Sequence, residues 1–411
     1  MTATAQAAKE EHHTTGSPRE VLAAFTKLGL TSFGGPIAHL GYFRAEFVER
    51  RKWLDETAYA DLVALCQFLP GPASSQVGFA LGLMRGGWLG ALAAWTGFTL
   101  PSAIALILFG FGAGALGGAT GAGLLHGLKL VAVAIVAQAV WGMARSLCPD
   151  RERTGIAVGA ILLITFAGGA LGQIAAIVLG GLAGAWICRS APATAVGHLP
   201  PIRVSRRVGG LLLATFAIVL VLPPLLLAAP IASQALALFD AFYRSGALVF
   251  GGGHVVLPLL REAVVTPGWL TDDAFLAGYG AAQAVPGPLF TFAAYLGTVA
   301  RIVPSGIGGA CIALIAIFLP GLLLVAGALP FWDAFRRRGW AQATMRGTNA
   351  AVVGVLGAAL YDPVWTSAIL RPADFALAVA GFLLLTVWRT PPLIVVVLGA
   401  IGGILLSIAA L

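Results

Sequence analysis

Residues 67–72 read Gln67-Phe-Leu-Pro70-Gly71-Pro72, and the chain repeats this pattern 216 positions later as Gln283-Ala-Val-Pro286-Gly287-Pro288. Both copies belong to a series of matches that keeps one order along the chain. The other members are Phe25-Thr-Lys27-Leu-Gly29 with Phe242-Tyr-Arg244-Ser-Gly246, Phe33-Gly34-Gly35 with Phe250-Gly251-Gly252, Arg44 with Arg261, Trp53-Leu54 with Trp269-Leu270, and Leu100-Pro101 with Leu319-Pro320. An ordered series of matches indicates an internal duplication. The sequence therefore predicts two homologous halves.

The composition is typical of a membrane protein. The 411 residues are 59% hydrophobic and 10% charged, with a mean hydropathy of +0.91, whereas a soluble domain carries about 25% charged residues. This excludes a soluble enzyme, a disordered tail and a nucleic-acid module, so the net charge of +8 is attributed to basic cytoplasmic loops. Five segments without Asp, Glu, Lys or Arg exceed the roughly 20 residues that cross a bilayer: 86–128, 154–188, 208–239, 302–332 and 390–411. Continuous apolar runs predict an all-α polytopic membrane protein.

The basic residues indicate that the two halves have opposite orientations. Loop 44–52 holds four basic residues and segment 110–120 holds none, whereas the second-half counterpart of 110–120 contains Arg336, Arg337 and Arg338. Because Lys and Arg mark the cytoplasmic side, we expect an inverted-topology repeat with a cytoplasmic N-terminus. The expected divisions are a cytoplasmic tail at 1–18, a first repeat at 19–190, a basic linker with a connecting transmembrane helix at 191–230, and a second repeat at 231–411.

Breaks in the helices of each half indicate where the functional site lies. In the first half we expect short helices at 19–32 with 36–48 and at 56–69 with 72–85; length leaves open whether these pairs are re-entrant or complete crossings. Interrupted helices are costly in lipid and persist where the freed backbone groups line a cavity or bind a ligand. The break residues are Gly34, Gly35, Pro70, Gly71 and Pro72 in the first half, and Gly251, Gly252, Pro286, Gly287 and Pro288 in the second.

The repeated Pro-Gly-Pro element favours an anion site. Proline suits the first turn of a helix, so the backbone N–H groups near Ser74 and Ser75 stay free at a positive helix end. Thr291 holds the matching place in the second half, and Gln67 and Gln283 each precede the element by three residues. Two such helix ends, brought together by the pseudo-twofold, would bind an anion without a dedicated cation. A simple tight turn is the alternative interpretation.

Three cations inside apolar sequence are candidate substrate ligands. Lys27 and Arg244 hold equivalent positions six residues before the Phe-Gly-Gly breaks, and we interpret both as having no acid close in sequence. Lys129 is flanked by apolar residues, and its second-half equivalent is Asn349. An intramembrane cation suggests a functional site, and an anionic substrate would satisfy it. Snorkelling of the long side chains to the lipid headgroups is the alternative.

Three further residues are candidates for proton coupling, and no motif for a cofactor is found. Asp61 lies six residues before Gln67, and His39 and His254 follow the two Phe-Gly-Gly breaks. A structural carboxylate and two packing histidines are the alternatives. The four cysteines share no metal-ligand spacing, and no nucleotide-binding loop or catalytic triad is present. We therefore expect a protein that is not an enzyme and that needs neither a metal nor a cofactor.

The motifs resemble those of the chromate ion transporter (CHR) family in its long two-domain form. The first-half residues that carry the resemblance are Phe33-Gly-Gly-Pro-Ile-Ala-His39, Phe47-Val-Glu-Arg-Arg-Lys-Trp-Leu54, Gln67-Phe-Leu-Pro-Gly-Pro-Ala-Ser-Ser-Gln76 and Phe98-Thr-Leu-Pro-Ser102. The second-half residues are Phe250-Gly-Gly-Gly-His-Val-Val-Leu-Pro258 and Gly278-Tyr-Gly-Ala-Ala-Gln-Ala-Val-Pro-Gly-Pro288. The resemblance covers nearly the whole chain. It implies a multi-pass carrier of the bacterial inner membrane that exports chromate, a sulfate-like divalent oxyanion, and confers chromate resistance.

Export agrees with the scarcity of carboxylates in the apolar segments, because outward movement of a dianion can be driven by the membrane potential, alone or with a proton gradient. A carrier of sulfate or another oxyanion, an anion channel and a chromate reductase are the alternatives, and the reductase lacks any flavin, haem or clustered-cysteine signal. The expected partners are chromate, with sulfate as a second candidate substrate, and the lipid bilayer. The coupling ion and the formation of a homo-oligomer are left open.

Overall fold

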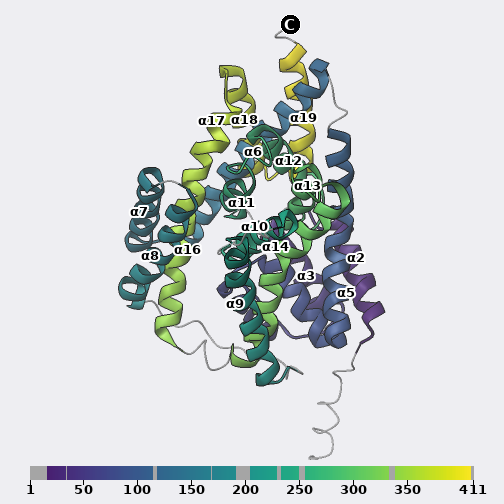
Figure 1. Ribbon diagram of the computed structural model, residues 1–411, viewed down its shortest axis with the longest axis vertical. Helices are drawn as coiled ribbons and strands as arrows, with labels where there is room; N and C mark the ends of the chain where they lie inside the picture. Colours follow the sequence, from purple (N-terminus) through teal and green to yellow (C-terminus); the bar gives the residue numbers. More distant parts are fainter. Residues whose placement is uncertain are drawn as a thin grey trace, which may run out of the picture.

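The computed structural model describes residues 16–33, 35–113, 118–167, 169–190, 204–228, 233–249, 255–332 and 338–408 (Figure 1). All regular structure in these residues is helical, which confirms the all-α prediction. Helices long and apolar enough to cross a membrane are Ala73–Gly112, Gly121–Leu147, Arg206–Leu227, Gly306–Phe331 and Gly339–Ala368. Shorter apolar helices are Gly172–Ile187, Leu289–Val299, Pro372–Thr386 and Pro392–Ile408. The chain is therefore a multi-pass membrane protein.

The first half contains seven α-helices among the described residues and one π-helical turn. Its elements are α2 (Pro18–Thr31), α3 (Gly35–Phe43), η1 (Arg44–Arg50), α4 (Glu56–Phe68), α5 (Ala73–Ala113), α6 (Gly118–Leu147), α7 (Arg151–Ala167) and α8 (Gly169–Ile187), followed by the 3₁₀ turn η2 (Cys188–Ser190). The sequence predicts a separation at residue 86, and α5 is indeed kinked there, with non-helical dihedral angles at Gly86 and Gly87. The connecting helix α9 spans Arg206–Leu227 and begins at the cap Ser205.

The second half repeats this order. Its elements are α10 (Gln234–Ala247), α11 (Val256–Val264), α12 (Asp272–Ala282), η4 (Leu289–Thr291), α13 (Phe292–Val299), α14 (Gly306–Ala328), η5 (Leu329–Phe331), α16 (Gly339–Ala359), η6 (Leu360–Trp365), α17 (Thr366–Ala368), α18 (Pro372–Thr386) and α19 (Pro392–Ile408). In Figure 1, α5 ends and α6 begins at the top, whereas α14 ends and α16 begins at the bottom. This opposite course of equivalent helices confirms the inverted repeat.

Local sequence explains where the short helices begin and how they are joined. Ser17 caps α2 and Ser233 caps α10, each by accepting a hydrogen bond from a backbone N–H of the first turn. Arg44 Nε donates to Glu56 Oε1 at 2.8 Å, and Arg261 Nε donates to the equivalent acid, Asp272 Oδ1, at 2.7 Å. These equivalent ion pairs fasten the two broken-helix hairpins.

The long helices are packed across the halves. Helix α19 of the second half lies along α6 of the first, and α16 of the second half lies along α8 of the first. A Cβ on Gly403 would come within 2.5 Å of Gly127 Cα, and a Cβ on Gly184 within 2.5 Å of Gly347 Cα. In lipid, such close backbone approach through small residues is the main source of helix association. The two halves are therefore interlocked.

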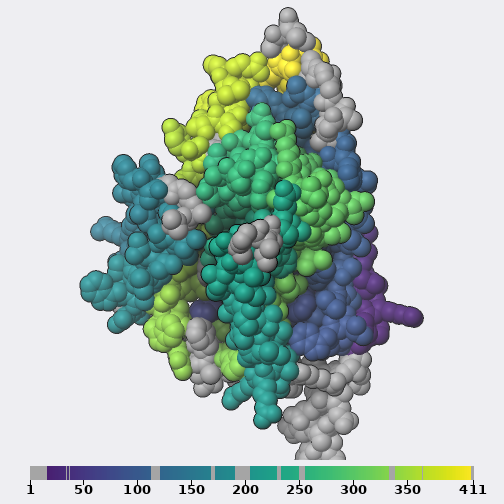
Figure 2. All heavy atoms as spheres, viewed as in Figure 1, coloured from purple at the N-terminus to yellow at the C-terminus, as the bar shows by residue number. Residues whose placement is uncertain are grey.

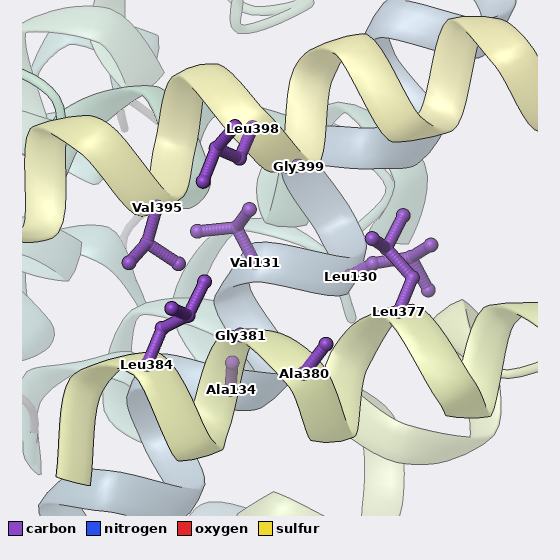
Figure 3. Close-up of a pocket in the computed structure, with 10 residues that line it drawn as sticks. All are labelled: Leu130, Val131, Ala134, Leu377, Ala380, Gly381, Leu384, Val395, Leu398 and Gly399. Atoms are coloured by element: carbon purple, nitrogen blue, oxygen red, sulfur yellow. The ribbon is translucent and has the colours of Figure 1, made fainter. Parts of the chain in front are cut away.

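A small cavity of about 40 Å³ lies between α6, α18 and α19 (Figure 3). Its lining is apolar and includes Val131, Leu384, Val395 and Leu398. A void of this size and polarity cannot solvate an oxyanion, which needs several hydrogen-bond donors. It is a packing defect among the three helices, and the candidate functional site lies elsewhere.

Candidate functional site

Each Pro-Gly-Pro loop is bound to the broken helix of the other half. The Gly71 N–H donates to the Val249 carbonyl at 2.7 Å, and the Gly287 N–H donates to the Ser32 carbonyl at 2.8 Å. Gly71 and Gly287 are equivalent in the repeat, as are Ser32 and Val249. The two hydrogen bonds are therefore related by the internal repeat. They hold both Pro-Gly-Pro loops at the interface between the halves.

The glycine at the centre of each loop is required by backbone geometry. Gly71 has a φ of +124° and Gly287 a φ of +98°, a region that side-chain-bearing residues rarely adopt. A Cβ on Gly71 would lie 2.9 Å from Gly321 Cα, and a Cβ on Gly287 would lie 2.9 Å from Ser102 Oγ. The flanking prolines 70, 72, 286 and 288 separate the helices, as predicted from the sequence. The first loop thus packs closely on α14, and the second loop packs closely on α5.

Five buried polar side chains belong to the segments next to the two loops, and we call them the polar cluster: Ser32, His39, Ser74, Ser75 and Thr99. Each is at most 2% exposed. His39 Nδ1 lies 3.4 Å from Ser74 Oγ, and the His39 ring packs edge-on against Phe98. The Ser32, Ser75 and Thr99 hydroxyls and His39 Nε2 have no hydrogen-bond partner within the described chain. Buried polar atoms without partners are unusual in folded proteins, so the cluster is suited to a polar ligand.

Gln76 holds the first loop in place and was missed as a site residue in the sequence. Its Nε2 atom donates to the Pro70 carbonyl and to the Gly321 carbonyl, both at 3.0 Å. It could have been found as the last residue of the motif Pro72-Ala-Ser-Ser-Gln76. The two predicted glutamines differ from each other: Gln67 is exposed on α4, whereas Gln283 ends α12 with a buried, unpartnered Nε2.

The second-half equivalents of the polar cluster are mostly apolar, and the site is therefore less symmetric than the sequence predicts. Val249, Val256, Phe290 and Phe318 replace Ser32, His39, Ser74 and Thr99. Thr291 replaces Ser75, and its hydroxyl donates to the Pro288 carbonyl at 2.7 Å within a 3₁₀ turn. The two Pro-Gly-Pro loops make equivalent backbone hydrogen bonds. Only the first-half segments, however, contain a set of polar side chains without partners.

The predicted cations lie outside the polar cluster. Arg244 Nε donates to Asp240 Oδ1 at 3.1 Å, one turn away in α10, so the interpretation that Arg244 has no acid close in sequence is wrong. Lys129 Nζ donates to Asp273 Oδ1 at 2.8 Å and thereby joins α6 to α12. Lys27 is exposed on α2, and no ion pair in the described part of the chain includes it. None of the three is among the five residues of the polar cluster.

A family model described as Chromate transporter matches residues 19–185 and 236–404, one copy in each half. The chain belongs to the chromate transporter family. This chromate transporter family member is 29% identical over 402 residues to the chromate transport protein of Pseudomonas aeruginosa, covering 93% of this chain and 90% of that protein. Its identity to the chromate transport protein of Cupriavidus metallidurans is 27% over 399 residues, covering 93% and 92%. The matches confirm the resemblance drawn from the motifs.

An uncharacterized transporter of Methanocaldococcus jannaschii is 25% identical to this family member over 331 residues, covering 80% of each chain. No solved structure matches the chain.

The residues predicted for proton coupling have different surroundings where the structure describes them. Asp61 is buried on α4, where Trp332 Nε1 donates to its Oδ1 at 3.3 Å. His39 belongs to the polar cluster instead. His254 and the break residues Gly34, Gly251 and Gly252 lie outside the described residues. Gly35 starts α3 with a φ of +79°, as expected of a break.

Proposed function

We propose that this protein exports chromate across the bacterial inner membrane and thereby confers chromate resistance. The chain belongs to the chromate transporter family, and relatives that match it over most of their length are named chromate transport proteins. The N-terminus and the basic loops lie on the cytoplasmic side in this proposal, because short cytoplasmic loops collect Lys and Arg. The proposed domains are the tail at 1–18, the repeats at 19–190 and 231–411, and the linker with α9 at 191–230.

The polar cluster is the observation that carries the proposal. A tetrahedral dianion accepts hydrogen bonds on every side, and the Ser74 and Ser75 hydroxyls, the first N–H groups of α5 and His39 Nε2 are donors of the required kind. A buried donor without a partner costs about 1–3 kcal/mol, which a bound oxyanion would offset. The cluster contains no carboxylate that would repel the anion.

The remaining predicted residues serve the path to this cluster. Lys27, Arg244 and Lys129 would attract and guide the dianion, and the exposed Lys27 has no acidic partner among the described residues to compete with it. Gln67, Gln283 and Thr291 supply neutral hydrogen-bonding groups beside the two loops. We propose no metal or cofactor and no enzymatic step.

Everted vesicles that carry the protein test this function. Labelled chromate should accumulate inside them when the membrane is energised, and unlabelled chromate should abolish the uptake of label. Protein-free vesicles and vesicles with the Ser74→Ala/Ser75→Ala double variant are the controls. Uptake that is equal in all three preparations would refute chromate transport through the polar cluster.

Sulfate is a second candidate substrate, because the hydrogen-bond donors of the cluster would contact the oxygen atoms of a tetrahedral dianion and not its central atom. Competition by sulfate in the same vesicles ranks the two anions. An anion channel is separated from a carrier by counterflow, since substrate on the far side accelerates uptake only in a carrier.

A further inference from the structure

Helices α12 and α4 are equivalent in the repeat, yet they are packed differently. Helix α12 lies along α6, and all its residues from Phe275 to Ala282 are buried. Gly280 permits this contact, because a Cβ there would lie 3.0 Å from Leu128 Cβ. Helix α4 lies on α5, and within the described residues it has no comparable packing on α16, the counterpart of α6. The fold is therefore asymmetric at two places that the duplication makes equivalent.

Exposure on α4 shows which surface is left open. Ala60, Ala64 and Gln67 are exposed, whereas their equivalents Leu276 and Gly280 are buried and Gln283 is partly buried. In the repeat, Ala64 is the equivalent of Gly280, and Thr348 is the equivalent of Leu128. The face of α4 that corresponds to the packed face of α12 is thus exposed, whereas Thr348 of α16 is 7% exposed and lies against Gly181 of α8.

An ion pair fastens the packed side only. Lys129 Nζ lies 2.8 Å from Asp273 Oδ1, with the lysine side chain 10% exposed and the aspartate side chain 74% exposed. The pair joins the first half to the second at the N-terminal end of α12. Its equivalents are Asn349 and Thr57, which carry no charge. If α4 came into contact with α16, no ion pair would therefore form between these two positions.

The two places lie toward opposite ends of the molecule. In Figure 1, α12 lies in the upper part of the view, as α18 and α19 do, whereas α16 and α9 both begin in the lower part. Figure 2 shows a hollow between the lower part of α16 and α9. Arg206, Arg207 and Arg338, at the starts of α9 and α16, belong to this lower end. By the orientation proposed above, the open end faces the cytoplasm.

We propose that Lys129 and Asp273 form the latch of a periplasmic gate between α6 and α12, which this structure holds closed while the equivalent cytoplasmic gate between α16 and α4 is open. The inference rests on the proposed transport function, because a carrier must open its two gates in turn. Lys129 and Asp273 are positioning residues here: they select the state that admits substrate from the cytoplasm. The latch biases the carrier toward this state, since the equivalent positions at the opposite gate, Thr57 and Asn349, are neutral.

A single cysteine at Ala64 reports on the cytoplasmic gate. In a variant whose native Cys66, Cys148, Cys188 and Cys311 are replaced, Ala64→Cys should react readily with a membrane-impermeant maleimide added to everted vesicles. Adding Asp273→Asn should slow this labelling at least threefold, because α4 then spends more time against α16. The charge-swapped pair Lys129→Asp/Asp273→Lys should restore the rate.

Matched controls and a second measurement keep the test decisive. Glu262→Gln removes a carboxylate of α11 that accepts a hydrogen bond from Thr266 in the same segment, so it should leave the labelling rate unchanged. A disulfide between Thr57→Cys and Asn349→Cys, the equivalents of Asp273 and Lys129, should form faster when Asp273→Asn is added. The latch would be overturned if Ala64→Cys were not labelled when Lys129 and Asp273 are both present. It would also be overturned if Asp273→Asn changed neither the labelling rate nor the rate of disulfide formation. Neither readout requires chromate, so a latch that behaves as expected without chromate transport would refute the proposed function alone.

Discussion

At the scale of single residues, hydroxyl groups define the site more than cations do. Ser75 is 2% exposed and its Oγ has no partner in the described chain, whereas Arg244 already has Asp240 within 3.1 Å. From the sequence alone, the cations are the preferred candidates for substrate ligands, because a charged residue in an apolar segment is easily recognised. The buried hydroxyls are ordinary residues by composition, and only their lack of partners marks them.

Replacing Ser75 by alanine should weaken chromate binding. Loss of one buried donor costs about 1–3 kcal/mol, so we expect the KM for chromate to rise roughly 5- to 150-fold. Initial rates of labelled chromate uptake measure this change. Ser245→Ala is the matched control, because Ser245 is also buried but its hydroxyl already donates to the Ala241 carbonyl at 2.7 Å. Equal KM values for the two variants would remove Ser75 from the site.

Replacing either equivalent cation should abolish transport without removing the protein from the membrane. We expect Lys27→Ala and Arg244→Ala each to lose chromate uptake, because a dianion crossing a low-dielectric path needs compensating charge. Lys27→Arg keeps the charge and should retain most activity. Uptake is measured beside the amount of protein in isolated membranes. Wild-type uptake in both alanine variants would show that snorkelling explains these residues.

At the scale of helices, the glycines of the crossed pairs carry the packing. Gly127 of α6 faces Gly403 of α19, and Gly347 of α16 faces Gly184 of α8. Each pair comes from different halves, so separating the helices of one pair separates the halves as well. Dispersion contacts and close backbone approach are what hold such helices together in lipid.

Valine at position 127 should therefore destabilise the protein. Its side chain would overlap the α19 backbone, and overpacking of this kind costs typically about 1–3 kcal/mol. Gly142→Val in the same helix is the control, since a Cβ at Gly142 meets nothing within 4 Å. We expect a lower midpoint of thermal unfolding in detergent for Gly127→Val than for Gly142→Val. Equal midpoints would show that α6 and α19 tolerate separation.

The helices and their breaks could be predicted from the sequence, but the partners of the helices could not. Apolar runs, prolines and glycines act locally, and so the breaks at Pro70–Pro72 and Pro286–Pro288 are evident without coordinates. The contact of Gly127 with Gly403 joins residues 276 positions apart, and no local signal specifies it. Lys129 with Asp273 is of the same kind. Arg244 with Asp240 differs, because their spacing of four in a helix is sufficient to predict the pair.

At the scale of the whole molecule, the duplication gives two similar gates and one polar cluster. Symmetric contacts at Gly71 and Gly287 keep the loops equivalent in backbone, while the side chains around them have diverged. A symmetric scaffold allows both gates to use the same motion. An asymmetric site and an ion pair at only one gate let the two sides of the membrane differ in how substrate enters and leaves.

The membrane potential should set the chromate gradient that this carrier maintains. Moving a dianion outward across about 100 mV, inside negative, releases about 4.6 kcal/mol, enough for a concentration ratio near 10³. Each change of about 30 mV should therefore alter the limiting accumulation ratio tenfold. Everted vesicles with the potential set by potassium and valinomycin, at equal pH inside and outside, measure this slope. Accumulation that persists at zero potential and disappears when a pH gradient is collapsed would replace potential-driven export by proton antiport, with Asp61 as the first carboxylate to substitute.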